Sequence, residues 1–334
     1  MIIVAVALII FIIAGITFGA AKITLSEIIA SIFSNENSNS TQIIWNIRLP
    51  RVLAAALAGV SLSVSGAAMQ SLLRNPLASP VSLGISHAAA FGAAFAIVIL
   101  GVGTSFSHPS DAIIVHNPYI ITICAFLGSL ISTLIILLIA KYKNSTPETI
   151  VLAGIICSSL FIAAFSALQY LADDVQLSSV VFWMFGDLGK AGWNDFFILL
   201  VMIIPVLIYF IKNRWNYNVL HAGDETATSM GVNVNKIRMR GMIVAALAAA
   251  VPVSFFGVIS FIGLVVPHIV RRFVGSDERF LIPASALFGG MFLLFSDTIA
   301  RNIISPAILP VGILTSFIGA PLFIYLLMKG IRRY

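Results

Sequence analysis

The side chains best suited to bind an ionic partner are three arginines, Arg48, Arg51 and Arg301, which adjoin apolar segments of the chain. The topology derived below places them on the outer side of a membrane, where basic residues are disfavoured. There they can bind acidic groups of an external protein or an anionic substrate. They can also extend to lipid phosphates or pair with Asp297, and from the residues alone this second interpretation is the favoured one.

Motifs for catalysis, nucleotide binding or metal binding are absent from the chain. The sequence contains no GxxxxGK[ST] loop and no HExxH, GxSxG or CxxC motif. Cys124 and Cys157 lie within apolar segments and are expected to be reduced packing residues, so neither a disulfide nor a metal site is predicted. Charge deep within the apolar segments is also lacking, which weakens a proton-coupled carrier or an intramembrane protease. We therefore expect no enzyme activity and no cofactor bound by this chain.

The polar segment at residues 212–240 is the most informative loop. The run DETATSM (224–230) predicts one short helix, with Asp224 as the N-cap and Gly231 as the C-cap. A second short helix is expected to follow, with Asn233 as its cap. Two short helices would form a rigid surface for a cytosolic partner, which would explain a transporter without its own energy source; an ordinary polar loop is the alternative.

The elements that must position these residues are membrane helices. Of the 334 residues, 60% are hydrophobic and 10% are charged, and several uncharged stretches are long enough to cross a bilayer. This composition excludes a soluble enzyme, a disordered chain and a disulfide scaffold, and the continuous apolar runs exclude an outer-membrane barrel. Breaks at proline, glycine, asparagine and charge define ten candidate spans, at residues 2–21, 52–73, 81–104, 118–140, 149–171, 194–211, 241–257, 258–273, 281–300 and 306–328.

The basic residues set the predicted orientation. With ten spans, both termini share one side, and a cytoplasmic N-terminus leaves only five of the 19 basic residues outside, namely Lys22, Arg48, Arg51, Lys190 and Arg301. The positive-inside rule prefers this arrangement, so the net charge of +6 reflects topology and does not require nucleic acid. The N-terminal apolar run is too long for a signal peptide and lacks a charged start, so it is expected to be the first span.

Two short helices are expected outside, at residues 22–33, before a polar loop at 34–41, and around residues 178–185, before Gly186. Spans two to five and seven to ten would run in opposite orientations. This is compatible with an inverted repeat of the kind that transporters use, although no sequence repeat is visible.

Seven motifs resemble those of the FecCD-type permeases, the membrane subunits of ABC importers for ferric siderophores, haem and cobalamin. They occur in the same order and spacing from about residue 43 to the C-terminus. The chain departs from the pattern at Ser79 and Ile308, where the family often has acidic residues. The motifs are RLPR (48–51), GAAMQSLLRNPLASP (66–80), LGIS (83–86), FWMFGDLG (182–189), GVISFIGLVVPHIVRRFVG (257–275), SDTIAR (296–301) and LPVGILTSFIGAPLFIYLL (309–327).

The resemblance implies an all-α integral membrane protein whose residues 1–334 form one permease domain of ten helices. Two copies, or two close relatives, would enclose the translocation path in the cell membrane of a prokaryote. Two ATPase subunits, which use ATP and magnesium, would bind inside, and an extracytoplasmic substrate-binding protein would bind outside. ATP would then drive alternating access. An ion-coupled secondary transporter and a membrane-embedded enzyme are the alternatives.

Positions that match the family's motifs supply the expected site residues. The three outer arginines would receive acidic residues of the binding protein, which now outweighs the lipid interpretation. A coupling segment at about residues 221–240 would enter a groove of the ATPase, through Asp224, Glu225, Thr226, Ala227, Met230, Gly231 and Val232. The cytoplasmic gate would consist of Asn75, Leu77, Ser145 and Thr146, although a helix stop and a polar turn also explain these four residues.

Overall fold

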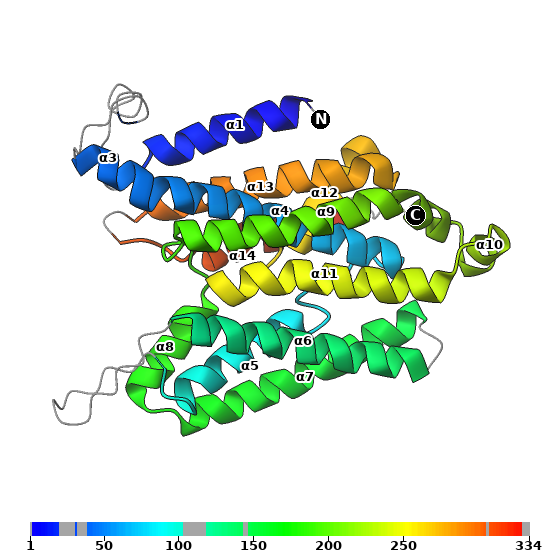
Figure 1. Cartoon of the computed structure of the whole chain (residues 1–334), viewed down its shortest axis with the longest axis horizontal. Helices are drawn as coiled ribbons and strands as arrows, with labels where there is room; N and C mark the ends of the chain where they lie inside the picture. Colours follow the sequence, from blue (N-terminus) through cyan, green and yellow to red (C-terminus); the bar gives the residue numbers. More distant parts are fainter. Residues whose placement is uncertain are drawn as a thin grey trace. The chain divides into compact units, whose positions relative to one another are not determined.

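The computed structural model describes residues 2–19, Ser31, 39–102, 118–142, 146–304 and 307–328. These residues form helices and connections, with no strand among them (Figure 1). The predicted outer helix at residues 22–33, most of the loop after it, and Ser145 lie outside this part. An all-helical protein is thereby confirmed for the part of the chain that the structure describes.

A helix lies at each of the ten predicted spans. They are α1 (Ile2–Thr17), α4 (Leu49–Leu72), α5 (Ile85–Val98), α6 (Pro118–Tyr142), α7 (Pro147–Leu171), α9 (Trp193–His221), α11 (Val234–Phe256), α12 (Ile262–Val274), α13 (Glu278–Asn302) and α14 (Val311–Met328). Shorter helical elements precede or connect them, namely α3 (Asn39–Ile43), the π-helical turn η1 (Ile44–Arg48), α8 (Asp174–Met184) and α10 (Asp224–Ser229).

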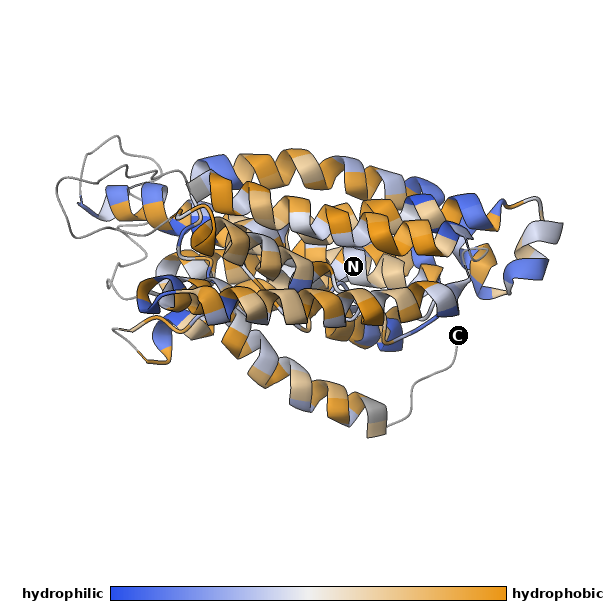
Figure 2. Cartoon of the chain, turned by 90° about the horizontal axis from the view of Figure 1, so that it is seen from below, coloured by the Kyte–Doolittle hydropathy of each residue, from blue (hydrophilic) through white to orange (hydrophobic). Residues whose placement is uncertain are grey.

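Several of these helices are long and apolar enough to cross a bilayer. Within the described residues, six helical segments meet that requirement, and three shorter apolar helices accompany them, at Ile2–Thr17, Ile85–Val98 and Val311–Leu326. Hydrophobic residues cover most of the length of the long helices, and hydrophilic residues gather near their ends (Figure 2). The chain is therefore a multi-pass membrane protein. The count of ten spans and the inverted repeat stay predictions.

Two predicted boundaries in the polar segment at residues 212–240 are wrong. Helix α9 continues to His221, ten residues past its predicted end. The expected second short helix is the beginning of α11, which continues into the membrane-spanning part, although Asn233 does cap it by accepting a bond from Lys236 N at 3.0 Å. The predicted helix before Gly186 is confirmed as α8, which begins with a capping box formed by Asp173 and Gln176.

Contacts between Cα atoms divide the chain into two compact units. Unit 1 comprises Met1–Ala67, Asp187–Asn218 and Ile259–Tyr334, and unit 2 comprises Ala68–Gly186 and Val219–Val258. Two of the four boundaries fall inside α4 and α9, and the other two fall in the connections after α8 and α11. The prediction of one domain over residues 1–334 stays a prediction.

Unit 1 is packed through close approaches of small residues on α4. A Cβ at Gly66 would overlap the backbone of Gly263 in α12, and a Cβ at Gly59 would overlap the Gly289 carbonyl in α13. Close backbone contact at small residues is how membrane helices gain packing energy without a hydrophobic driving force. Helix α13 also packs against α1 and α12.

Unit 2 is built around α5, which packs against α6, α7 and α8. Alanines on α5 leave room for the phenylalanine and leucine side chains of α7. The core consists of Ala90, Ala94, Ile97, Phe165, Leu168 and Val180. Helix α11 packs against α6 and α5 in the same unit, so the end of α11 that follows α10 is held on a rigid support.

Candidate functional site

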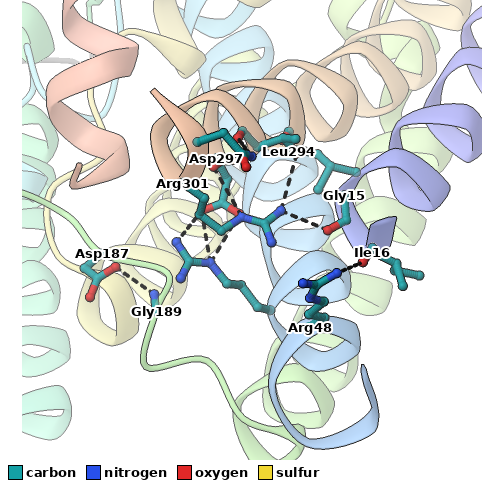
Figure 3. Close-up of polar contacts among 11 residues, drawn as sticks. Gly15, Ile16, Arg48, Asp187, Gly189, Leu294, Asp297 and Arg301 are labelled. Carbon is teal, nitrogen blue, oxygen red and sulfur yellow. Dashed lines mark hydrogen bonds and ion pairs between the residues drawn. The ribbon is translucent and has the colours of Figure 1, made fainter. Parts of the chain in front are cut away.

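In unit 1, Arg51 and Arg301 enclose the carboxylate of Asp297, and Arg48 lies near them (Figure 3). Arg51 donates from Nη2 to Asp297 Oδ1 at 2.7 Å and from Nε to both carboxylate oxygens at 3.2 Å. Arg301, one turn after Asp297 on α13, forms a second ion pair at 3.0 Å. Asp297 is fully buried and each arginine side chain is 7% exposed. This carboxylate joins the start of α4 to the end of α13.

Two of the arginines also bind the carboxyl-terminal end of α1. Arg48 donates from Nη1 to the carbonyls of Ile16 at 2.6 Å and Thr17 at 2.9 Å, and Arg301 donates from Nη2 to the Gly15 carbonyl at 3.1 Å. The last carbonyls of a helix have no partner within the helix and carry partial negative charge. The arginines supply hydrogen bonds to these carbonyls at the end of α1. These hydrogen bonds explain how the charged side chains are tolerated in a buried position.

A turn at Asp187–Gly189 lies beside Arg51. The carboxylate of Asp187 accepts a bond from Gly189 N at 2.7 Å. A Cβ at Gly189 would lie 3.2 Å from Arg51 Nη1 and 3.0 Å from both oxygens of Asp187. Lys190, the next residue, is exposed. Sequence reasoning did not include Asp187 or Lys190 in the site, although the FWMFGDLG motif ends at this turn.

The sequence left open whether the arginines pair with Asp297 or bind an external partner. The ion pairs of Arg51 and Arg301 with Asp297 are present. The contacts do not by themselves assign a partner to the cluster. Three guanidinium groups lie near one buried carboxylate and the half-buried Asp187, so positive charge is in excess at this end of unit 1. Binding of an acidic partner by Arg48, Arg51 and Arg301 stays a prediction.

The second candidate region is the short helix α10 in unit 2. The expected N-cap at Asp224 is wrong: Gly223 is the N-cap, with φ of 105°, and Asp224 is the first helical residue. The expected C-terminal role of Gly231 is confirmed, since its φ is 82°. Val232 N donates to the Ala227 carbonyl and Gly231 N to the Thr228 carbonyl, a Schellman arrangement that only glycine adopts without strain.

Side chains of α10 are mostly exposed. Met230 is 64% exposed although it is apolar. Of the predicted coupling residues, Glu225, Thr226 and Gly231 are also exposed, whereas Asp224 and Val232 are half-buried and Ala227 is buried. The side chain of Ala227 therefore packs against the rest of the permease and cannot contact a partner. A single exposed apolar side chain is ordinary on a protein surface, so Met230 does not by itself assign a partner to α10.

Asp224 anchors α10 through two arginines of unit 2. Arg238 of α11 donates from Nη2 to both oxygens of Asp224, at 2.8 and 3.1 Å, and Arg74 forms an ion pair with the same carboxylate at 3.1 Å. The Arg238 side chain is 1% exposed, and its Nε donates to the Leu72 carbonyl at 3.1 Å. Sequence reasoning missed both partners, because they lie far from Asp224 in the chain.

The predicted gate residues that the structure describes, Asn75, Leu77 and Thr146, lie in two connections of unit 2. Asn75 Oδ1 accepts a bond from Leu77 N at 2.9 Å, which closes the turn after α4, and Leu77 is 47% exposed. Thr146 is the N-cap of α7 and accepts a bond from Thr149 N at 3.3 Å. These local roles match a helix stop and a helix cap. A gating role stays a prediction.

The turn after α4 and the first turns of α7 line one cavity of about 370 Å³. The lining residues are Leu73, Arg74, Asn75, Pro147, Glu148, Val151, Leu152 and Ile155. The structure therefore brings the Asn75 turn and the start of α7 to the same cavity.

An exposed ion pair in unit 1 provides a useful contrast to these clusters. Arg279 donates to Asp277, and this hydrogen bond holds the pKa of Asp277 well below its usual range. The guanidinium of Arg279 also lies 4.6 Å from the ring centroid of Trp215. Within the described residues, no group of three or more His, Cys, Asp and Glu side chains could hold a metal ion.

The fold is that of a multi-pass helical membrane protein, and comparisons with known proteins identify its class as a membrane permease. The chain belongs to the FecCD transport family, whose sequence profile matches residues 7–329. It is similar to an ABC transporter permease protein of Methanocaldococcus jannaschii, with 53% identity over 94% of this chain and 90% of the relative. These matches identify the chain as a transport permease.

Two further relatives are named for what they transport. The hemin transport system permease protein HmuU of Yersinia pestis is 38% identical over 94% of this chain and 92% of its own length. The vitamin B12 import system permease protein BtuC of Vibrio vulnificus is 34% identical over 94% of this chain and 91% of its own. Among solved structures, an inward-facing metal-chelate type ABC transporter matches with a TM-score of 0.84 and 28% identity, over 98% of this chain and 97% of that one.

Proposed function

We propose that this chain is the permease of a binding-protein-dependent ABC importer, and that two copies form the path for a metal chelate such as a ferric siderophore, haem or cobalamin. The chain would lie in the cell membrane of a prokaryote with both termini in the cytoplasm. ATP and magnesium would be used by two separate ATPase subunits. The relatives that transport hemin and vitamin B12 support this substrate class, and the residues of this chain favour no member of it.

The observation that carries the proposal is the anchored and exposed helix α10. The side of the helix that faces the rest of unit 2 is fixed by Asp224 and Ala227. The solvent-exposed side presents Glu225, Thr226 and Met230. A helix anchored in this way can transmit a movement of its partner to the rest of the permease, because it moves together with the residues that anchor it. We infer that the ATPase binds this surface, with Met230 as the apolar anchor.

The arginine cluster supports binding of the substrate-binding protein at the other region. Excess positive charge attracts acidic groups even when the guanidinium groups are themselves covered, because the surrounding protein screens poorly. The turn at Asp187–Gly189 and the exposed Lys190 would present this charge to the partner. The docking surface would then depend on Arg48, Arg51 and Arg301 in two ways. The three arginines would maintain its shape and supply its positive electrostatic potential.

Alternating access would require the turn at Asn75 and Leu77 and the connection before α7 to move. The cavity that adjoins the Asn75 turn and the first turns of α7 supports this assignment, because elements that are not packed against each other can shift without losing core contacts. An ion-coupled secondary transporter is the second candidate, and it is weakened because the buried carboxylate of Asp297 is already paired with Arg51 and Arg301.

Retention of the ATPase by purified permease tests the docking assignment. Met230→Asp places a charge at the apolar anchor and should abolish co-purification of the ATPase encoded beside this permease. Ser178→Asp, at an exposed position of the short helix α8, is the matched control and should retain the ATPase. Equal retention by both variants would reject α10 as the ATPase-binding surface.

A further inference from the structure

We propose that Arg74 is a positioning residue that links α10 to the predicted gate, and that its ion pair with Asp224 transmits the movement of α10 to the turn at Asn75 and Leu77. This inference rests on the proposed function. The Arg74–Asp224 ion pair would be the physical connection between the ATPase-binding helix and the gate.

Geometry places Arg74 between the two elements. It directly precedes Asn75, and its Nη2 lies 3.1 Å from Asp224 Oδ1. Its Nη1 would lie 3.7 Å from a Cβ at Gly223, so the guanidinium covers the beginning of α10. A carboxylate at this end of a helix is favoured by the free backbone N–H groups. Arg74 therefore holds α10 at the point where the helix begins.

The two ion pairs of Asp224 have different characters. Arg238 is 1% exposed and also binds the Leu72 carbonyl, so its pair with Asp224 is a fixed anchor between α10, α11 and the end of α4. Loss of this contact would leave the buried guanidinium of Arg238 without its carboxylate, which strongly destabilises a protein. The side chains of Arg74 and Asp224 are 32% and 37% exposed. A partly exposed pair can form and break at small cost, so it is the pair that can change during a transport cycle.

The backbone of Arg74 is also constrained. Its φ is 46°, in the left-handed region that residues with a Cβ rarely occupy. Arg74 N donates to the Ser71 carbonyl and Asn75 N to the Gln70 carbonyl, so the turn continues directly from the last residues of α4. A strained conformation persists only while surrounding contacts maintain it. Loss of the Asp224 contact would therefore favour a different shape of the Asn75 turn.

Space for that change is present beside the turn. A cavity of about 370 Å³ is lined by Arg74 and Asn75 and by Pro147, Glu148 and Val151. The turn can therefore shift into this space without displacing a packed core. The same cavity reaches the start of α7, where Thr146 caps the helix.

The test uses vesicles that contain the permease with its ATPase and binding protein. Hemin, cyanocobalamin and a ferric hydroxamate are each supplied as transport probes, and uptake is measured per ATP hydrolysed. Arg74→Asn removes the charge with a residue that tolerates the left-handed region, and Arg74→Lys retains the charge. Arg279→Asn is the matched control, because it removes a similarly exposed arginine–aspartate pair that does not contact α10. A cysteine at Leu77, which is exposed, reports the turn through its rate of thiol labelling.

We expect Arg74→Asn to lower uptake per ATP about two- to fivefold, the range for loss of a partly exposed ion pair. It should also abolish the ATP-dependent change in labelling at Leu77→Cys. Arg74→Lys and Arg279→Asn should both stay within about twofold of the wild type. Wild-type coupling and labelling in Arg74→Asn would overturn the inference and leave the proposed function intact. Absence of ATP-driven uptake of any probe by the wild type would overturn both.

Discussion

Arg51 and Asp297 lie 246 positions apart in the sequence and form a buried ion pair at 2.7 Å. The pair joins the first turn of α4 to the last turns of α13. Arg301 shares the same carboxylate at 3.0 Å. One aspartate therefore holds two arginines at one end of unit 1, and the shape of the predicted docking region depends on it.

Replacement of Asp297 by alanine should destabilise the permease by about 3–5 kcal/mol, because two arginines would stay buried without their carboxylate. SDS titration of the purified protein in mixed micelles measures this loss. Asp174→Ala removes an exposed carboxylate at the start of α8 and should change stability by less than about 0.5 kcal/mol. A change equally small for Asp297→Ala would show that the cluster is not a structural unit.

Lys190 offers a test of docking that leaves the buried cluster unchanged, since its side chain is exposed. Lys190→Glu should weaken association with the substrate-binding protein about tenfold at low salt and less at high salt, because charges at the rim of an interface mainly act through long-range attraction. Surface plasmon resonance on permease in nanodiscs measures the affinity. Lys236→Glu reverses an exposed lysine beside α10 and should leave it unchanged. Unaltered affinity in Lys190→Glu would place the binding protein elsewhere.

Gly231→Ala should loosen the end of α10, because a Cβ at φ of 82° costs about 1 kcal/mol even though no atom obstructs it. We expect uptake per ATP to fall while the melting temperature in detergent changes little. Gly275→Ala is the matched control, since Gly275 has φ of 77° at the end of α12 and also adjoins open space. Equal loss of coupling in both variants would refute a specific role for α10.

Gly66→Ala should destabilise unit 1 by about 1–3 kcal/mol or more, because its Cβ would overlap the backbone of Gly263, which cannot yield as a side chain can. Gly15→Ala is the milder comparison, since its Cβ would meet the side-chain atoms of Val52 at 3.1 Å and Leu294 at 3.3 Å. Thermal unfolding of both variants in the same detergent gives the order. A Gly66→Ala variant as stable as Gly15→Ala would contradict the close approach of α4 and α12.

Much of the fold could be predicted from hydrophobic runs, because a membrane helix shows its length directly in the sequence. The end of α9 could not. Asn213, Asn216 and Asn218 indicate a loop when read locally, yet Asn213 binds the Tyr209 carbonyl one turn earlier, and Asn218 binds Asp277 of the same unit. Polar residues with partners in the folded chain do not end a helix.

The candidate sites were predictable to the extent that they are local. Gly231 follows α10 as a helix-ending glycine should, and Asn233 caps α11 as expected. Asp224 is also of a residue type that often serves as an N-cap. Its carboxylate instead forms ion pairs with Arg74 and Arg238, and Gly223 is the N-cap. Pairing across such distances along the chain depends on the tertiary fold, and helix-capping preferences contain no information about it.

Uptake into vesicles that contain the permease, its ATPase and its binding protein tests the central claim most directly. With ATP enclosed and all ion gradients collapsed by ionophores, at least one of hemin, cyanocobalamin or a ferric hydroxamate should accumulate, and omission of the ATPase should abolish the accumulation. Accumulation by the permease alone, driven by an ion gradient with no ATPase present, would contradict the account and identify a secondary transporter.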